Sequence, residues 1–161
     1  IIFSNLQKIF DDPSNVEIRK NLAFGSMISG LAFSNTKTTA VHSVSYPITL
    51  HFNVPHGLAC ALTLSQFILF NSEENEDNTD EAPERLQKIS EAIGAENPEK
   101  AALMITELMK NLDLPTKLSE VGMDEKGIEL VIKEGFTPDR VKHNPRILTE
   151  EKLREILQEL L

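Results

Sequence analysis

Apolar residues recur every three or four positions along most of the chain, which is the spacing of one face of an α-helix. No segment alternates apolar and polar residues over the length of a β-strand. We therefore predict an all-α fold, a multi-helix bundle that forms one domain over residues 1–161. The pattern places its helices at about 1–10, 14–32, 36–50, 56–70, 84–94, 98–111, 124–134 and 150–160.

Residues at the expected helix ends support these boundaries. Ser14 followed by Glu17 has the spacing of a capping box at the start of the second helix. Asp124 and Thr149 are typical N-cap residues for the last two long helices. Pro47 lacks an amide hydrogen, so we expect the third helix to bend or end close to it.

Acidic residues are distributed very unevenly along the chain. The protein has 25 Asp and Glu residues, yet none lies between Ile18 and Ser72. A run of this length without carboxylates indicates central, mostly buried helices. The segment 71–83 is instead polar and acidic, and we predict that it forms a mobile loop.

Composition narrows the class of protein. A chain of 161 residues with 40% hydrophobic and 25% charged residues is typical of one globular domain. The net charge of −9 argues against a nucleic-acid partner, and no apolar run reaches the roughly 20 residues that span a membrane. The single cysteine, Cys60, cannot form an intramolecular disulfide, which favours a cytoplasmic location, and we interpret it as a small core residue.

Three of the four histidines, His42, His51 and His56, lie close together in the sequence. His42 falls inside one predicted helix and His56 starts the next, so a helix–loop–helix turn can bring both imidazoles together. Imidazole is a suitable ligand for Fe(II) and Zn(II). Two neutral imidazoles supply no negative charge, however, and the acid-free segment contains no carboxylate. A metal site here would need an anionic ligand from elsewhere; the alternative is a pair of hydrogen-bonded core histidines.

A set of short motifs around these histidines resembles the signature of the iron-containing (group III) alcohol dehydrogenases. The likeness extends over the whole chain and is most specific in residues 30–62. The matching residues are Gly30–Asn35, Val41–His42, Pro47, Pro55–Gly57 and, before the last helix, Asn144–Arg146.

The resemblance implies a two-domain enzyme, of which this chain is the C-terminal helical, metal-binding domain. An N-terminal dinucleotide-binding domain would be its partner. His42 and His56 match two metal ligands of the family, while an Asp and a His one helical turn apart would precede Ile1. With two of four ligands, this chain alone is expected to bind metal weakly and to be catalytically inactive.

The implied reaction is hydride transfer between NAD(P) and an alcohol or aldehyde, with Fe²⁺ or Zn²⁺ polarising the substrate oxygen. Phe33 matches an aromatic position near the nicotinamide and the substrate; the alternative is a plain core residue. Tyr46 stands where many members have a second histidine, and a phenol is a poorer proton relay near neutral pH than an imidazole. His51 matches no ligand position, and we interpret it as a structural residue or one that orients a ligand.

Lys37 lies in the segment 35–40, where many relatives carry small residues. This segment resembles the phosphonoacetaldehyde-reductase-like branch of the family, so Lys37 is a candidate for binding an anionic substrate group; the alternative is a lysine that only covers a helix end. Two other interpretations of the chain stay open. One is a catalytically silent helical domain, and the other is a relative of zinc-using glycerol or polyol dehydrogenases. A homo-oligomer is compatible with either.

Overall fold

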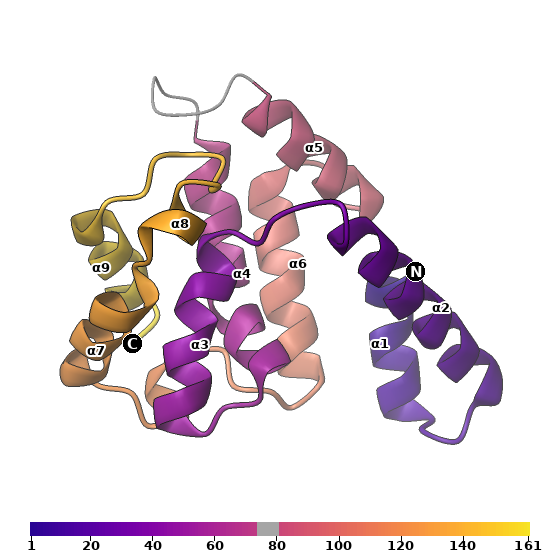
Figure 1. The fold of residues 1–161 in the computed structure, drawn as a ribbon. Helices are drawn as coiled ribbons and strands as arrows, with labels where there is room; N and C mark the ends of the chain where they lie inside the picture. The colour runs from indigo at the N-terminus through magenta and orange to yellow at the C-terminus, as the bar shows by residue number, and fades with distance from the viewer. Residues whose placement is uncertain (74–80) are drawn as a thin grey trace.

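A computed structural model describes residues 1–73 and 81–161, apart from the side chains of residues 138 and 140. The described residues form helices and connecting turns without an extended β-sheet, which confirms the all-α prediction (Figure 1). In chain order the elements are α1 (Ile2–Asp11), α2 (Val16–Phe33), α3 (Ala40–Phe52), α4 (His56–Ser72), α5 (Ala82–Ala92), α6 (Pro98–Asn111), the 3₁₀ turn η1 (Ser119–Val121), α7 (Glu125–Gly135), α8 (Pro138–Val141) and α9 (Glu150–Gln158).

The hydrophobic core lies between α3, α4, α7 and α9. Helix α3 packs against both α4 and α7, while α6 covers another side of α4 and α9 packs on α7. Fully buried side chains from all four core helices meet there, among them Ile48, Phe67, Val131 and Leu153. The two helices that carry the histidines of interest are therefore held from several sides.

Several predicted helix ends are confirmed and others are corrected. Asp124 and Thr149 cap α7 and α9 through their side chains, as predicted. The second helix is capped by Asn15, whose side chain accepts a hydrogen bond from the amide of Ile18, so the prediction for Ser14 was wrong. Pro47 lies inside α3 without ending it, and the helix continues for more than a turn to Phe52.

The predicted acidic loop 71–83 is shorter than its sequence suggested. Helix α4 extends to Ser72, and α5 already begins at Ala82. Asn71 is buried and pairs with Asn144, whose side-chain amide donates to Asn71 Oδ1 over 2.7 Å. Residues 74–80 lie outside the described part of the chain, so the mobility of this loop stays a prediction.

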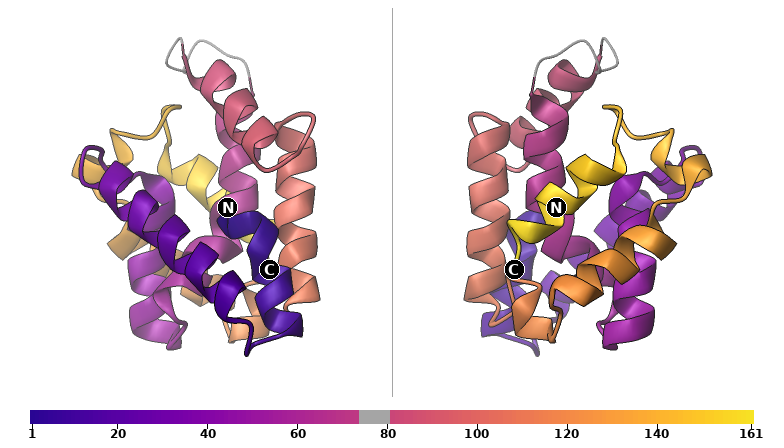
Figure 2. Two further views of the ribbon diagram at one scale, coloured as in Figure 1. Left: turned by 90° about the vertical axis from the view of Figure 1, so that its right-hand side faces the viewer. Right: turned by 90° about the vertical axis from the view of Figure 1, so that its left-hand side faces the viewer.

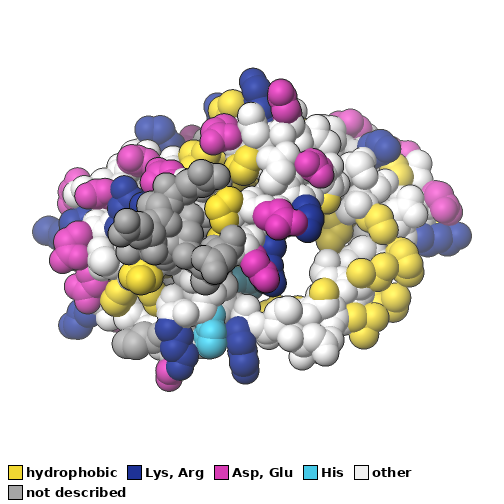
Figure 3. All heavy atoms as spheres, turned by 90° about the horizontal axis from the view of Figure 1, so that it is seen from above, with side chains coloured by type: hydrophobic (Ala, Val, Ile, Leu, Met, Phe, Trp, Pro, Cys, Tyr) yellow, Lys and Arg dark blue, Asp and Glu magenta, His cyan; other side chains and the backbone are white. Residues whose placement is uncertain are grey.

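The acid-free run does not form a uniformly buried core, which corrects the prediction made from its composition. Helices α3 and α4 are buried as expected, but Gly25 is the single buried residue of α2. Helices α1 and α2 pack mainly on each other at one end of the molecule (Figures 1 and 2). Viewed from above, hydrophobic side chains gather at that end (Figure 3). The exposed apolar residues of α2 are Val16, Phe24, Met27, Ile28, Leu31 and Phe33.

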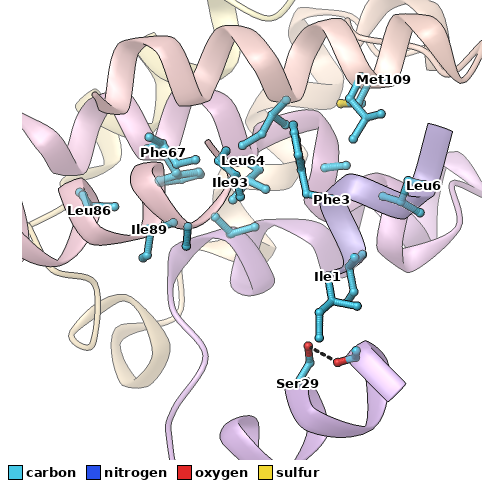
Figure 4. Close-up of a pocket in the computed structure, with 18 of the residues that line it drawn as sticks. Ile1, Phe3, Leu6, Ser29, Leu64, Phe67, Leu86, Ile89, Ile93 and Met109 are labelled. Atoms are coloured by element: carbon cyan, nitrogen blue, oxygen red, sulfur yellow. Dashed lines mark hydrogen bonds between the residues drawn. The ribbon is translucent and has the colours of Figure 1, made fainter. Parts of the chain in front are cut away.

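An apolar cavity of about 780 Å³ lies between α1 and the helices α4, α5 and α6. Phe3 and Leu6 point into it from α1, and Leu64, Ile89 and Met109 line it from the bundle (Figure 4). Most of its lining residues are apolar, and Ser29, Thr39 and Asn71 are polar residues among them. Among the described residues, no helix is both long and apolar enough to cross a membrane.

A close approach between α3 and the end of α7 fixes the position of α3. A Cβ atom on Gly135 would lie 3.2 Å from the backbone of both Ser43 and Val44 and from the Pro47 ring. The Ser43 hydroxyl donates a hydrogen bond to the Gly135 carbonyl oxygen. Backbone atoms cannot move aside as a flexible side chain can, so this contact leaves no space for a larger residue.

Replacing Gly135 with valine should therefore destabilise the fold. The added methyl groups would force α3 and α7 apart, and overpacking of this kind costs about 1–3 kcal/mol. The matched control is Gly30→Val, because a Cβ at Gly30 meets no atom within 4 Å and α2 is exposed there. Thermal unfolding followed by circular dichroism should show a clear loss of stability for Gly135→Val and little change for Gly30→Val. Equal stability of the two variants would contradict the packing described for α3 and α7.

Candidate metal centre

Three potential metal donors meet where α3 faces the start of α4. His42 comes from α3, and His56 and Cys60 come from the first turns of α4. One donor atom of each residue lies within 4.8 Å of the corresponding atoms of the other two. The rings of His42 and His56 have their centroids 5.4 Å apart and meet edge to face. The predicted convergence of these two histidines is thus present.

The turn between α3 and α4 is responsible for this convergence. Helix α3 ends at Phe52, and Asn53 adopts the left-handed conformation with φ of 53°, which reverses the chain direction. Pro55 then precedes α4, so His56 is the first helical residue. Because α3 and α4 pack along each other, this short connection places His56 opposite the ring of His42.

Ser45 contacts the imidazole of His56. Its hydroxyl donates a hydrogen bond to the backbone carbonyl of His42 over 2.8 Å. The lone pairs of the hydroxyl oxygen therefore remain available to accept another hydrogen bond. The same oxygen lies 3.3 Å from Nδ1 of His56, where it can accept the Nδ1 proton. In this arrangement Nε2 of His56 carries the free electron pair. A second hydrogen bond of this type commonly fixes the tautomer of histidines that bind metals.

Cys60 was interpreted from the sequence as a core residue, but it is only half-buried and lies next to the histidines. Its Sγ is 3.8 Å from Nε2 of His56. Burial raises the pKa of the Cys60 thiol above its ordinary value, and a hydrogen bond with Ser45 offsets part of this rise. The spacing His56-x-x-x-Cys60 places two donors one helical turn apart, and this was the signal in the sequence that could have revealed it.

Two aromatic rings flank the histidine pair. Phe33, at the end of α2, stacks on His42 with ring centroids 6.3 Å apart, and Tyr46 stacks on His56 at 5.4 Å. Phe33 is 57% exposed and Tyr46 is 46% exposed. Both predicted site residues are therefore next to the donors and accessible from outside the domain.

The other candidate residues lie outside this cluster of donors. His51 Nε2 is 2.8 Å from a carboxylate oxygen of Glu134 on α7, so His51 links two helices, in line with a structural role. Lys37 lies exposed in the connection between α2 and α3, five positions before His42. The apolar cavity is separate from the centre, since none of the three donor residues lines it.

The chemistry of the donors fits a divalent metal ion. Two imidazole nitrogens and a thiol sulfur are ligands that zinc and other transition metals accept in proteins. His56 is exposed, so the cluster remains open to further ligands and to a substrate. Among the described residues, the group of donor atoms that lie within this distance of one another contains no carboxylate.

Comparison with known proteins places the chain in a family. The model of the Fe-containing alcohol dehydrogenase family, C-terminal part, matches residues 1–161. Among proteins of known activity, the NAD-dependent methanol dehydrogenase of Bacillus methanolicus is 25% identical over the whole chain, which spans 42% of that protein. The phosphonoacetaldehyde reductase of Streptomyces viridochromogenes is 27% identical over 96% of the chain, which spans 39% of that protein.

A solved structure shows the same arrangement of helices. The sulfoacetaldehyde reductase of Bifidobacterium kashiwanohense, determined in complex with NAD⁺, superposes with a TM-score of 0.85 and 30% identity. The match covers 98% of this chain and 40% of that protein. The chain thus spans about two fifths of the length of these relatives. It belongs to the Fe-containing alcohol dehydrogenase family and corresponds to the C-terminal domain of these enzymes.

Proposed function

We propose that this chain is the metal-binding domain of an NAD(P)-dependent alcohol dehydrogenase or aldehyde reductase. The observation that carries this proposal is the convergence of His42 and His56 from two packed helices. The orientation of His56 by Ser45 supports it, because a histidine held in one tautomer presents a defined lone pair. Bound there, Fe²⁺ or Zn²⁺ would polarise the oxygen of an alcohol or aldehyde, while the nicotinamide would carry the hydride.

The residues around the donors have separate roles in this proposal. Phe33 provides an apolar surface beside His42, against which a nicotinamide ring or a substrate carbon chain can pack. Tyr46 places a phenol beside His56, where its hydroxyl can hold a substrate or a water molecule by a hydrogen bond. Ser45 acts through His56 and positions its ring.

We further propose that an N-terminal dinucleotide-binding domain completes the active site. The chain spans about two fifths of its relatives, and the sulfoacetaldehyde reductase structure contains NAD⁺. Phe33 belongs to the exposed apolar face of α2 and also touches His42, so this face leads directly to the donors. A second domain that covers the face would exclude water from the reaction and bring the nucleotide to the metal.

An anionic aldehyde is the substrate class that we favour. Two similar proteins are named for aldehydes that carry a phosphonate or a sulfonate group. Lys37 offers a positive charge five residues before His42, in a segment with no Asp or Glu to neutralise it. An exposed ammonium group in this place can attract such an anion and hold it by a charge-assisted hydrogen bond.

Loss of a metal-binding histidine should lower the metal content of the full-length protein. His42→Ala and His56→Ala each remove one donor, and we expect affinity for the metal to fall at least about tenfold. His51→Ala is a matched control on the same helix, because His51 contacts Glu134 and lies outside the donor cluster. Elemental analysis after anaerobic purification measures the bound metal and also distinguishes iron from zinc. Metal content that is unchanged in both variants, or lost equally in His51→Ala, would refute the proposed centre and favour a catalytically silent domain.

Lys37 should contribute to kcat/KM for anionic substrates and not for neutral ones. We expect Lys37→Ala to lower kcat/KM for phosphonate- or sulfonate-bearing aldehydes about tenfold or more, because a hydrogen bond to a charged group is lost. The kcat/KM for neutral aldehydes should hardly change, and Lys37→Arg should retain part of the activity. Lys20→Ala is the control, since Lys20 is exposed on α2 and pairs with Glu17. Equal losses on neutral and anionic aldehydes would show that Lys37 does not recognise the anion.

A further inference from the structure

We propose that the apolar cavity between α1 and the helices α4, α5 and α6 is the docking site of a helical segment that precedes Ile1 in the full-length protein. The occupant is then part of the same polypeptide, and it completes the core of the helical domain. The inference goes beyond the proposed function, because it concerns packing and holds whether or not the centre binds a metal. It shares with that proposal the premise that further chain precedes Ile1.

The lining of the cavity suits an apolar occupant. None of the described residues that line it is charged, and most are aliphatic or aromatic. Of the polar ones, Ser29 donates a hydrogen bond to the Gly25 carbonyl oxygen over 2.9 Å (Figure 4), and Asn71 pairs with Asn144. These two side chains are already bonded within the protein, so a polar ligand would gain little from them and would lose its hydrogen bonds to water.

The size of the cavity matches a piece of helix. Protein interiors contain few voids larger than a water molecule, so a space of about 780 Å³ with apolar walls calls for an occupant. It has roughly the volume of two helical turns, because an α-helix with its side chains is about 10 Å wide and rises about 5.4 Å per turn. Several lining side chains stay partly exposed, with Ile28 at 43%, Leu64 at 36% and Ile89 at 52%. Contiguous exposed apolar surface of this kind marks a contact site.

The position of Ile1 identifies the occupant as the preceding segment of the same chain. Ile1, Ile2 and Phe3 all line the cavity, so polypeptide upstream of Ile1 leads away from its wall (Figure 4). The chain spans about two fifths of its relatives and corresponds to their C-terminal domain, so in those proteins further sequence precedes the part that matches Ile1. A segment tethered beside the cavity has a high effective concentration there, which a free ligand or a second copy lacks.

The apolar walls also favour a helix over an extended segment. A buried backbone must have partners for its amide and carbonyl groups, and these walls offer almost none, so the occupant has to satisfy its own backbone as a helix does. The start of α1 fits a chain that arrives in helical form. Ile1 at its N-cap position makes no side-chain cap, and the side chains of Ser4 and Asn5 donate to the Ile1 carbonyl oxygen. The first amides of α1 would find acceptors in a preceding helical turn.

Photo-crosslinking of the full-length protein tests the proposal. A diazirine analogue of leucine, which is close to leucine in size, is placed at Leu64 in the cavity. We expect the main cross-linked peptide to come from the segment before Ile1 of the same molecule, so that the product keeps the monomer mass on a denaturing gel. Leu103 on α6 is the control position, since it is 55% exposed and does not line the cavity; the analogue there should not give this product.

Thermal unfolding of the full-length protein gives a second readout. Leu64→Ala would leave a gap beneath the docked segment and should lower Tm by about 4 °C or more, whereas Leu103→Ala should change it little. Circular dichroism at low temperature verifies that both variants are folded. Equal shifts for the two variants would count against a covered cavity.

The other possible occupants give different products. A dimer band would assign the cavity to a second copy, and an adduct of a co-purified lipid would assign it to a small apolar ligand; either would overturn the proposal, as would a cross-linking pattern identical to that of the Leu103 control. Metal content is measured on the same samples. Metal that does not depend on His42, together with the expected cross-link, would refute the proposed function and leave this inference standing.

Discussion

The packing of α3 against α4 is the constraint on which the rest of the structure depends. It places His42 on one helix opposite His56 at the start of the next, and the left-handed Asn53 allows the chain to reverse between them. Helix α3 is in turn fixed from its other side, where Gly135 lets α7 approach its backbone. The geometry of the candidate metal centre is therefore a consequence of how the core is packed.

The charge distribution leaves the candidate centre, taken by itself, without a carboxylate ligand. The two helices that carry the histidines have no carboxylate, which permits their burial but leaves two neutral ligands for a divalent cation. Cys60 lies half-buried beside His56, and this burial raises the pKa of its thiol. The exposed apolar face of α2 reaches His42 through Phe33, so the centre is open on this side in the structure.

Much of the fold could be predicted from periodicity and capping residues. The order of the long helices, the caps of α7 and α9, and the convergence of His42 and His56 are all present. The burial of α2 was predicted wrongly. Apolar composition indicates that a helix face favours burial, but it does not show which segment of a protein packs on that face. Cys60 was misread for a related reason: its apolar neighbours in sequence suggested a core position, whereas its place on α4 turns its side chain toward His56.

The wrong helix cap was a local error. Ser14 and Asn15 are both good capping residues, and sequence alone does not decide between neighbours of this kind. Pro47 is tolerated inside α3, where its ring packs close to Gly135 and its backbone lies buried. The resemblance of residues 30–62 to a dehydrogenase family was more informative than any single spacing, because it joined several weak signals into one pattern.

Anomalous diffraction from crystals of the metal-loaded full-length protein would test the central claim most directly. The account predicts an anomalous peak about 2.1 Å from a ring nitrogen of both His42 and His56. A well-ordered metal bound elsewhere, with the two imidazoles in contact only with protein and water, would contradict it.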